Sequence, residues 1–186
     1  MLVVDITPIG WLHSAACMIA LFAGALNLAA AKGTPQHRLV GRLYVWSTIV
    51  LNLSALTIFR FDTMQFKPFK AGPHVFGLFH WFAVASLIFV LIGRYAAARQ
   101  DRAPWPYVHP FAMVLSYYLL VGGAINEAFV RIDALHTLAA HSAGSLTHAM
   151  RAPIIGLAHT AAMAAAFVLI LYFIAKVVLY RRAARA

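Results

Sequence analysis

Five apolar stretches, each long enough to cross a lipid bilayer, run through this chain of 186 residues. A transmembrane helix needs about 20 predominantly apolar residues, and this requirement limits what such a chain can fold into. The stretches predict helices at residues 9–31, 39–59, 75–98, 110–131 and 155–179. Only 11% of the residues are charged, against roughly 25% in a soluble domain. We therefore predict an all-α integral membrane bundle that forms a single transmembrane domain over residues 1–186.

The basic residues predict the orientation of this bundle. With the N-terminus outside, ten of the 15 Lys and Arg residues fall on the inner side and five on the outer side. Cytoplasmic loops carry an excess of Lys and Arg, so we expect an N-outside, C-inside multipass protein of a bacterial inner membrane. The basic residues behind the formal net charge of +10 then lie at helix ends beside lipid headgroups. We therefore expect the lipid bilayer as the partner and no nucleic acid. The first residues carry no basic segment, so we expect the first helix to be retained rather than cleaved as a signal peptide.

Seven of the nine histidines fall at or near the outer side in this arrangement. They are His13, His74, His80, His136, His141, His148 and His159. Imidazole binds metal ions and haem iron, and it changes charge near neutral pH. Such a group in an otherwise apolar chain predicts a histidine-rich site near the outer face.

Small and polar residues repeat at helical spacing on four of the predicted helices. Such stripes mark packed interfaces in membranes, because small residues let two backbones approach. The stripes are His13, Cys17, Ala20, Gly24, Asn27 and Ala31; Gly77, His80 and Ala83; Ser116, Gly123 and Glu127; and His159, Ala162, Met163 and Ala166. The ionisable members are predicted to face the bundle interior at similar depth: His13, His80, Glu127 and His159.

Ionisable residues inside a transmembrane segment are costly and are treated as candidates for a functional site. Histidines from different helices could hold haem b through its iron. The same three histidines, His13, His80 and His159, could instead bind zinc or copper with Glu127 as a further ligand. The simpler alternative is that each histidine only hydrogen-bonds a neighbour or water.

A second group of candidates lies at the inner side. His37, Arg38 and Arg42 open the second predicted helix, and His109 opens the fourth. Imidazoles flanked by guanidinium groups could hold a haem propionate, a lipid phosphate or a quinone oxygen. The alternative is an interfacial anchor, in which the arginines reach lipid headgroups and Gly41 permits close helix contact.

The longest connection, residues 132–154, combines two kinds of surface. An apolar set comprises Leu135, Leu138, Ala139, Leu146 and Ala149, and a polar set comprises Thr137, His141, Ser145 and His148. This pattern favours a helix lying in the outer interface, with an ordinary loop and solvated histidines as the alternative.

The stretch His37-Arg38-x-x-Gly41-Arg42-x-Tyr44 resembles the signature of a bacterial multipass family of predicted membrane proteins whose function is unknown. Further positions resemble that family in order and spacing: Phe79, His80, His109, Met113, Tyr117 and Tyr118. The resemblance spans roughly residues 30–130 and implies a multipass membrane fold without an established chemistry. More weakly, histidines on several helices at two depths resemble membrane b-type cytochromes, although the second helix here has no interior histidine.

Three functions follow as hypotheses. The preferred one is electron transfer near the outer face, with bound haem b and with a quinone or a redox protein as partner. The second is a zinc- or copper-binding membrane protein. The third is a non-catalytic accessory subunit of a membrane complex, and a homo-oligomer stays open under all three.

Overall fold

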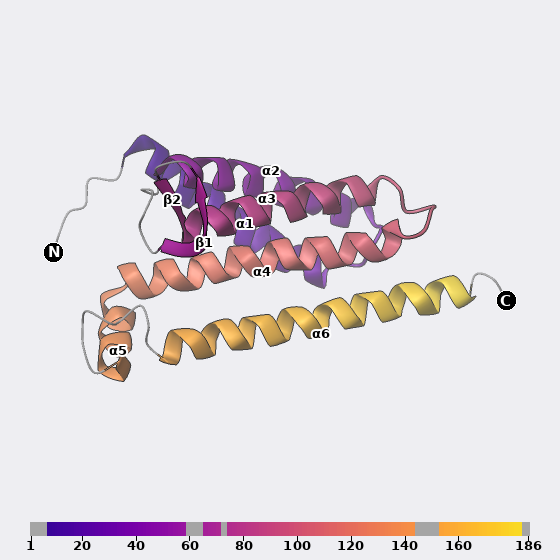
Figure 1. Ribbon diagram of the computed structural model, residues 1–186. Coiled ribbons are helices and arrows are strands. Elements are labelled where there is room, and N and C mark those ends of the chain that lie inside the picture. The colour runs from indigo at the N-terminus through magenta and orange to yellow at the C-terminus, as the bar shows by residue number, and fades with distance from the viewer. Residues whose placement is uncertain (1–6, 59–64, 72–73, 144–152, 184–186) are drawn as a thin grey trace. The chain divides into compact units, whose positions relative to one another are not determined.

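The computed structural model describes residues 7–58, 65–71, 74–143 and 153–183. The described chain forms six helices and a two-stranded hairpin (Figure 1). In chain order these are α1 (Pro8–Ala29), α2 (Pro35–Ile58), β1 (Gln65–Ala71), β2 (His74–Gly77), α3 (Leu78–Ala97), α4 (Trp105–Arg131), α5 (Asp133–Ala143) and α6 (Pro153–Ala183).

Five of the described helices, α1, α2, α3, α4 and α6, are long and apolar enough to cross a membrane by length and composition. Large apolar side chains such as Phe22, Trp46 and Leu157 stand exposed on their surfaces. Exposed apolar surface of this extent suits contact with lipid and is costly in water. The predicted class, an all-α membrane bundle with five spans, is confirmed.

The chain divides into two compact units, Met1–Arg94 and Tyr95–Ala186. In the first unit α1 packs along α2. The buried face of α1 consists of small residues only, namely Ala16, Ala20, Ala23 and Gly24. Part of the stripe predicted on this helix is thus confirmed, because Ala20 and Gly24 belong to it. The expectation of a single domain stays a prediction.

Helix α2 begins at Pro35, earlier than the predicted residue 39. Thr34 precedes it, and its Oγ1 accepts a hydrogen bond from the backbone N–H of His37 at 3.2 Å. Proline suits the first position of a helix because the N–H that it lacks would have no helical partner there. Threonine is a favourable capping residue for the same reason, since it satisfies a free backbone donor. His37 and Arg38 therefore lie in the first turn of α2.

The connection between the second and third predicted helices contains an antiparallel hairpin, which the sequence did not predict. Lys70 pairs with Val75 and Ala71 with His74, and the register is irregular between Gln65 and Lys70. Pro68 lies within this irregular stretch, where a residue without an N–H cannot donate to the strand ladder. Helix α3 consequently begins at Leu78 rather than at the predicted residue 75.

In the second unit α4 packs along α6, and α5 contacts both. Helix α4 begins at Trp105, with Pro106 in its first turn and Pro110 inside it. The prediction that the helix starts at residue 110 was wrong, because Pro106 occupies the favourable starting position and Pro110 is tolerated one turn later.

Part of the long connection is helical, as the pattern favoured. Helix α5 buries Ala139 fully, whereas Leu138 stays 48% exposed. Ala139 forms an apolar cluster with Phe129 of α4 and Ile155 of α6, and Leu135 packs against this cluster. Four other residues of the predicted faces lie outside the described residues: Ser145, Leu146, His148 and Ala149.

Candidate histidine sites of the two units

His13 lies in the second turn of α1 and contacts α2. Its Nδ1 lies 3.0 Å from the Oγ of Ser54. The hydroxyl hydrogen of Ser54 is used elsewhere, because this group donates to the carbonyl oxygen of Leu51 at 2.8 Å. A hydroxyl has one hydrogen, so in the arrangement in which Ser54 donates to Leu51 its oxygen accepts from His13, and the imidazole proton then sits on Nδ1. This hydrogen-bond network leaves the lone pair of the His13 ring on Nε2.

His80 lies in the first turn of α3 and is only 1% exposed. The prediction that it faces the interior is confirmed, and His13 is half-buried. Ser54 near the end of α2 contacts His13 near the start of α1, so these residues share the end of the first unit that carries the hairpin (Figure 1). His80 follows the hairpin directly and belongs to the same end.

A buried polar face on α2 was missed from the sequence. Tyr44, Thr48 and Asn52 are each at most 5% exposed, and they follow one another at steps of four. Asn52 donates from Nδ2 to the Oγ of Ser86 in α3 at 3.2 Å. The spacing of these three polar residues could have predicted this face, because residues four apart share one side of a helix.

In the second unit His159 of α6 meets α4. Its Nε2 lies 3.0 Å from the Oδ1 of Asn126, whose side chain is 3% exposed. The sequence placed Glu127 rather than Asn126 on the interior face of this helix, and Glu127 is half-exposed. His159 itself is also half-buried.

The buried face of α4 shifts along the helix, and this shift explains the misplaced stripe. In the first half the buried residues include Ala112, Ser116 and Leu120 at steps of four. In the second half they are Gly122, Asn126 and Phe129, around the cluster that α5 and α6 complete. A straight stripe drawn from Ser116 therefore misses Asn126.

The stripe predicted on the last helix needs a similar correction. Ala166 is buried, but Met163 is 54% exposed. The buried face continues through Ile170 and Phe173, so Met163 lies beside this face rather than on it. The Met163 side chain therefore does not point into the packed interior of the unit.

The histidines of the long connection behave differently from one another. His141 is exposed, and its Nδ1 lies 2.7 Å from the carbonyl oxygen of Thr137 in the same helix. His141 therefore makes a hydrogen bond within its own helix. His136, on the same helix, is half-buried. His148 lies outside the described residues, as does the side chain of His74.

The described parts of the chain contain no group of three or more His, Cys, Asp and Glu side chains that could hold a metal ion. His13 and His80 belong to the first unit, whereas Glu127 and His159 belong to the second. The predicted convergence of all four residues on one site stays a prediction.

The candidates for an inner anion site also belong to both units. In the first unit His37 is half-buried and Arg38 and Arg42 are exposed, and in the second unit His109 is half-buried. Binding of an anion by these four residues stays a prediction. The role expected for the neighbouring glycine is confirmed: a Cβ on Gly41 would lie 3.2 Å from the Nδ2 of Asn27 in α1.

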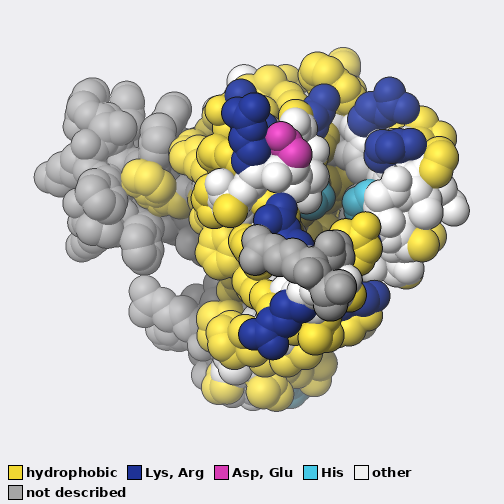
Figure 2. Space-filling model, turned by 90° about the vertical axis from the view of Figure 1, so that its right-hand side faces the viewer, with side chains coloured by type: hydrophobic (Ala, Val, Ile, Leu, Met, Phe, Trp, Pro, Cys, Tyr) yellow, Lys and Arg dark blue, Asp and Glu magenta, His cyan; other side chains and the backbone are white. Residues whose placement is uncertain are grey.

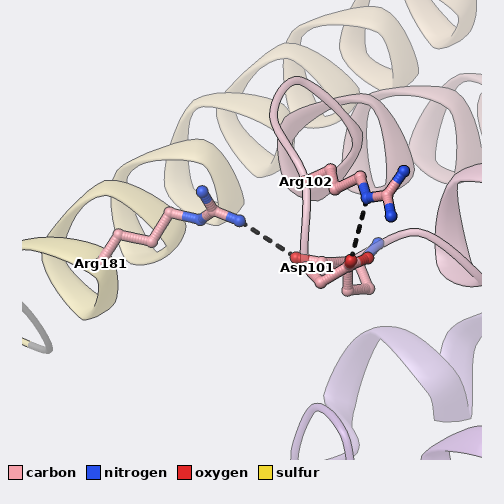
Figure 3. A network of polar contacts seen from close by, with 4 residues as sticks. Asp101, Arg102 and Arg181 are labelled. Carbon is pink, nitrogen blue, oxygen red and sulfur yellow. Dashed lines mark hydrogen bonds and ion pairs between the residues drawn. The ribbon is translucent and has the colours of Figure 1, made fainter.

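Basic side chains also lie at the end of α6 and in the turn before α4. The view in Figure 2 shows Lys and Arg side chains among hydrophobic ones, with little acidic surface beside them. In the second unit Arg181 of α6 donates to the carbonyl oxygen of Gln100 at 3.0 Å, and Arg102 lies 3.3 Å from Asp101 (Figure 3). Arg181 also lies 5.9 Å from the ring centre of Tyr107. The bond to Gln100 attaches the end of α6 to the turn that precedes α4, and the contact with Tyr107 attaches it to the first turn of α4.

Comparison with known proteins identifies the family. No curated protein and no solved structure matches the chain significantly. Residues 10–170 match the family described as "Predicted membrane protein (DUF2306)". This match extends beyond the residues on which the predicted resemblance rested and includes most of α6, while the likeness to b-type cytochromes stays a prediction. The chain is an integral membrane protein and belongs to the predicted membrane protein family DUF2306.

Proposed function

We propose that this protein binds haem b through His13 and transfers electrons near the outer face of a bacterial inner membrane. The observation that carries the proposal is the hydrogen bond between His13 and Ser54, at 3.0 Å. It holds the imidazole in the form whose Nε2 carries the lone pair. Histidines that bind metals usually donate their other ring N–H to a neighbouring acceptor, which fixes the tautomer and the ring orientation.

Haem suits the donors of the first unit better than a bare metal ion does. A porphyrin supplies four of the ligands of its iron, so the protein contributes at most two axial ligands. Structural zinc sites take four protein ligands and catalytic ones three. His13 would hold the haem iron, and His80, buried at the same end of this unit, is the candidate for a second ligand.

The remaining candidates have secondary roles in this proposal. His159 and Glu127 would form part of a polar site in the second unit. At the inner side, His37, Arg38 and Arg42 of the first unit would bind lipid headgroups, and so would His109 of the second unit. We infer the outer location of His13 from the excess of Lys and Arg at the opposite helix ends, among them Lys32, Arg38 and Arg94.

An absorption spectrum of the detergent-purified protein tests this function. We expect sharp visible bands that change when the air-oxidised sample is reduced with dithionite. A flat spectrum would rule out haem, and metal analysis of the same sample would then separate the alternatives. Stoichiometric zinc or copper would support the metal-binding hypothesis, and neither metal would leave the accessory subunit.

A further inference from the structure

The side-chain amide of Asn126 is nearly fully buried and only half satisfied. Its Oδ1 lies 3.0 Å from the Nε2 of His159, and the side chain is 3% exposed. Its Nδ2 is buried as well and has no hydrogen-bond partner among the described residues. Exchanging the amide oxygen and nitrogen would only transfer the deficit to the oxygen, because His159 contacts one end of the amide. Buried polar atoms are nearly always hydrogen-bonded, so this deficit indicates a missing partner.

The surroundings of Asn126 show what kind of partner fits. One turn further along α4 lies Phe129, which packs with Ile155 in the apolar cluster under α5. Ile125 and Ala158, the neighbours of Asn126 and His159 in sequence, pack against the same cluster. A ligand at this position therefore meets an apolar wall beside a hydrogen-bond donor.

Space is available one turn away on the same helix. A Cβ placed on Gly123 would meet no atom within 4 Å. Gly123 and Asn126 are three residues apart, so they lie on neighbouring positions of one helix face. A flat apolar ring could lie over Gly123 while its polar edge reaches the amide.

We propose that Asn126 and His159 form a binding site for the carbonyl group of a lipid-soluble quinone. The Nδ2 of Asn126 donates to the quinone oxygen, and His159 holds the amide in the orientation that presents this donor. The apolar cluster and the space beside Gly123 accommodate the ring. This site lies in the second unit and does not require haem in the first, so the two proposals stand or fall separately.

Calorimetric binding of decylubiquinone to the protein in nanodiscs tests the site. The discs are made of diether phospholipids, which lack the ester carbonyls that would compete for the same donor. We expect Asn126→Leu to weaken binding by about tenfold or more, the loss expected for one buried hydrogen bond. Gly123→Phe should weaken it similarly, because its ring would fill the space, while the amide stays intact.

The matched control is Asn52→Leu, which removes a buried asparagine of the first unit that already has a partner in Ser86. It should bind decylubiquinone like the wild type, and thermal unfolding of each variant shows whether it is folded. Absence of binding to the wild type would overturn the proposal, and so would Asn126→Leu or Gly123→Phe binding decylubiquinone as tightly as the wild type. Native mass spectrometry distinguishes a lipid from a quinone. If the wild type does not bind quinone but retains a diester phospholipid that Asn126→Leu loses, the site would be assigned to lipid instead.

Discussion

The Arg181 guanidinium donates a hydrogen bond to the Gln100 carbonyl oxygen across 3.0 Å, and this bond ties the end of α6 to the turn between α3 and α4. A charged donor makes a stronger hydrogen bond than a neutral one. The last turn of α6 is therefore held by a charged hydrogen bond as well as by the contact of Arg181 with the Tyr107 ring.

Replacing Arg181 by methionine should lower the stability of the second unit by about 1 kcal/mol, the value of a typical intramolecular hydrogen bond. Methionine keeps the apolar stem of the side chain, so the loss reports the guanidinium contact. Thermal unfolding in detergent measures the effect. The control is Arg182→Met, since Arg182 is exposed at the next position. Equal effects of the two substitutions would contradict a specific role for the bond to Gln100.

Gly41 should resist substitution because α1 and α2 approach each other there. A Cβ at this position would lie 3.2 Å from the Nδ2 of Asn27, so even alanine requires the amide to move. Alanine for glycine within a helix otherwise gains roughly 0.5–1 kcal/mol. We expect Gly156→Ala to show this gain, because a Cβ there would meet nothing within 4 Å. Gly41→Ala should show less of it and Gly41→Leu a clear loss of stability. A stabilising Gly41→Leu would show that the contact with Asn27 is unimportant.

The hydrogen bond from Asn52 to Ser86 should couple α2 and α3. Hydrogen bonds between transmembrane helices contribute about 0.6 kcal/mol on average. A double-mutant cycle with Asn52→Ala and Ser86→Ala should therefore give a favourable coupling of this size in unfolding experiments. The comparison cycle pairs Asn52→Ala with Ser47→Ala, because the Ser47 hydroxyl bonds to the carbonyl oxygens of Leu43 and Tyr44 in its own helix. A coupling no larger than in that cycle would contradict the expectation.

Removal of the Ser54 hydroxyl should weaken the proposed haem site without removing its ligand. Ser54→Ala deletes the acceptor that fixes the Nδ1 proton of His13. Loss of such an orienting partner typically reduces metal affinity by roughly 10–100-fold. Titration of the haem-free protein with haem measures this change. Ser47→Ala, another buried serine of α2, should leave the affinity unchanged. Equal haem affinities of wild type and Ser54→Ala would show that this hydrogen bond has no part in binding.

The sequence predicted much of this fold, because the length and apolarity of a helix that spans a membrane are local properties. The beginnings of α2 and α4 were misplaced, since Pro35 and Pro106 lie in the first turns of these helices but were assigned to the connections before them. The hairpin before α3 was not predicted, because an irregular pairing around Pro68 leaves no clean alternation of residues.

The candidate sites were predicted less completely. His80 has the predicted buried position, whereas in the second half of α4 Asn126 is buried rather than the predicted Glu127. Which of these two residues is buried depends on how α5 and α6 pack on the second half of α4. The spacing of small and polar residues along the sequence does not show this packing. The partner of His13 was also missed, because Ser54 is 41 residues away and belongs to a helix to which no polar face was assigned.

The haem content of the purified protein tests the central claim most directly. Haem is extracted into alkaline pyridine and measured against protein for the wild type, His13→Ala and His141→Ala. We expect stoichiometric haem in the wild type, its loss in His13→Ala and no change in His141→Ala, whose imidazole bonds only locally to the carbonyl oxygen of Thr137. A wild type without haem, or unchanged haem in His13→Ala, would contradict the account.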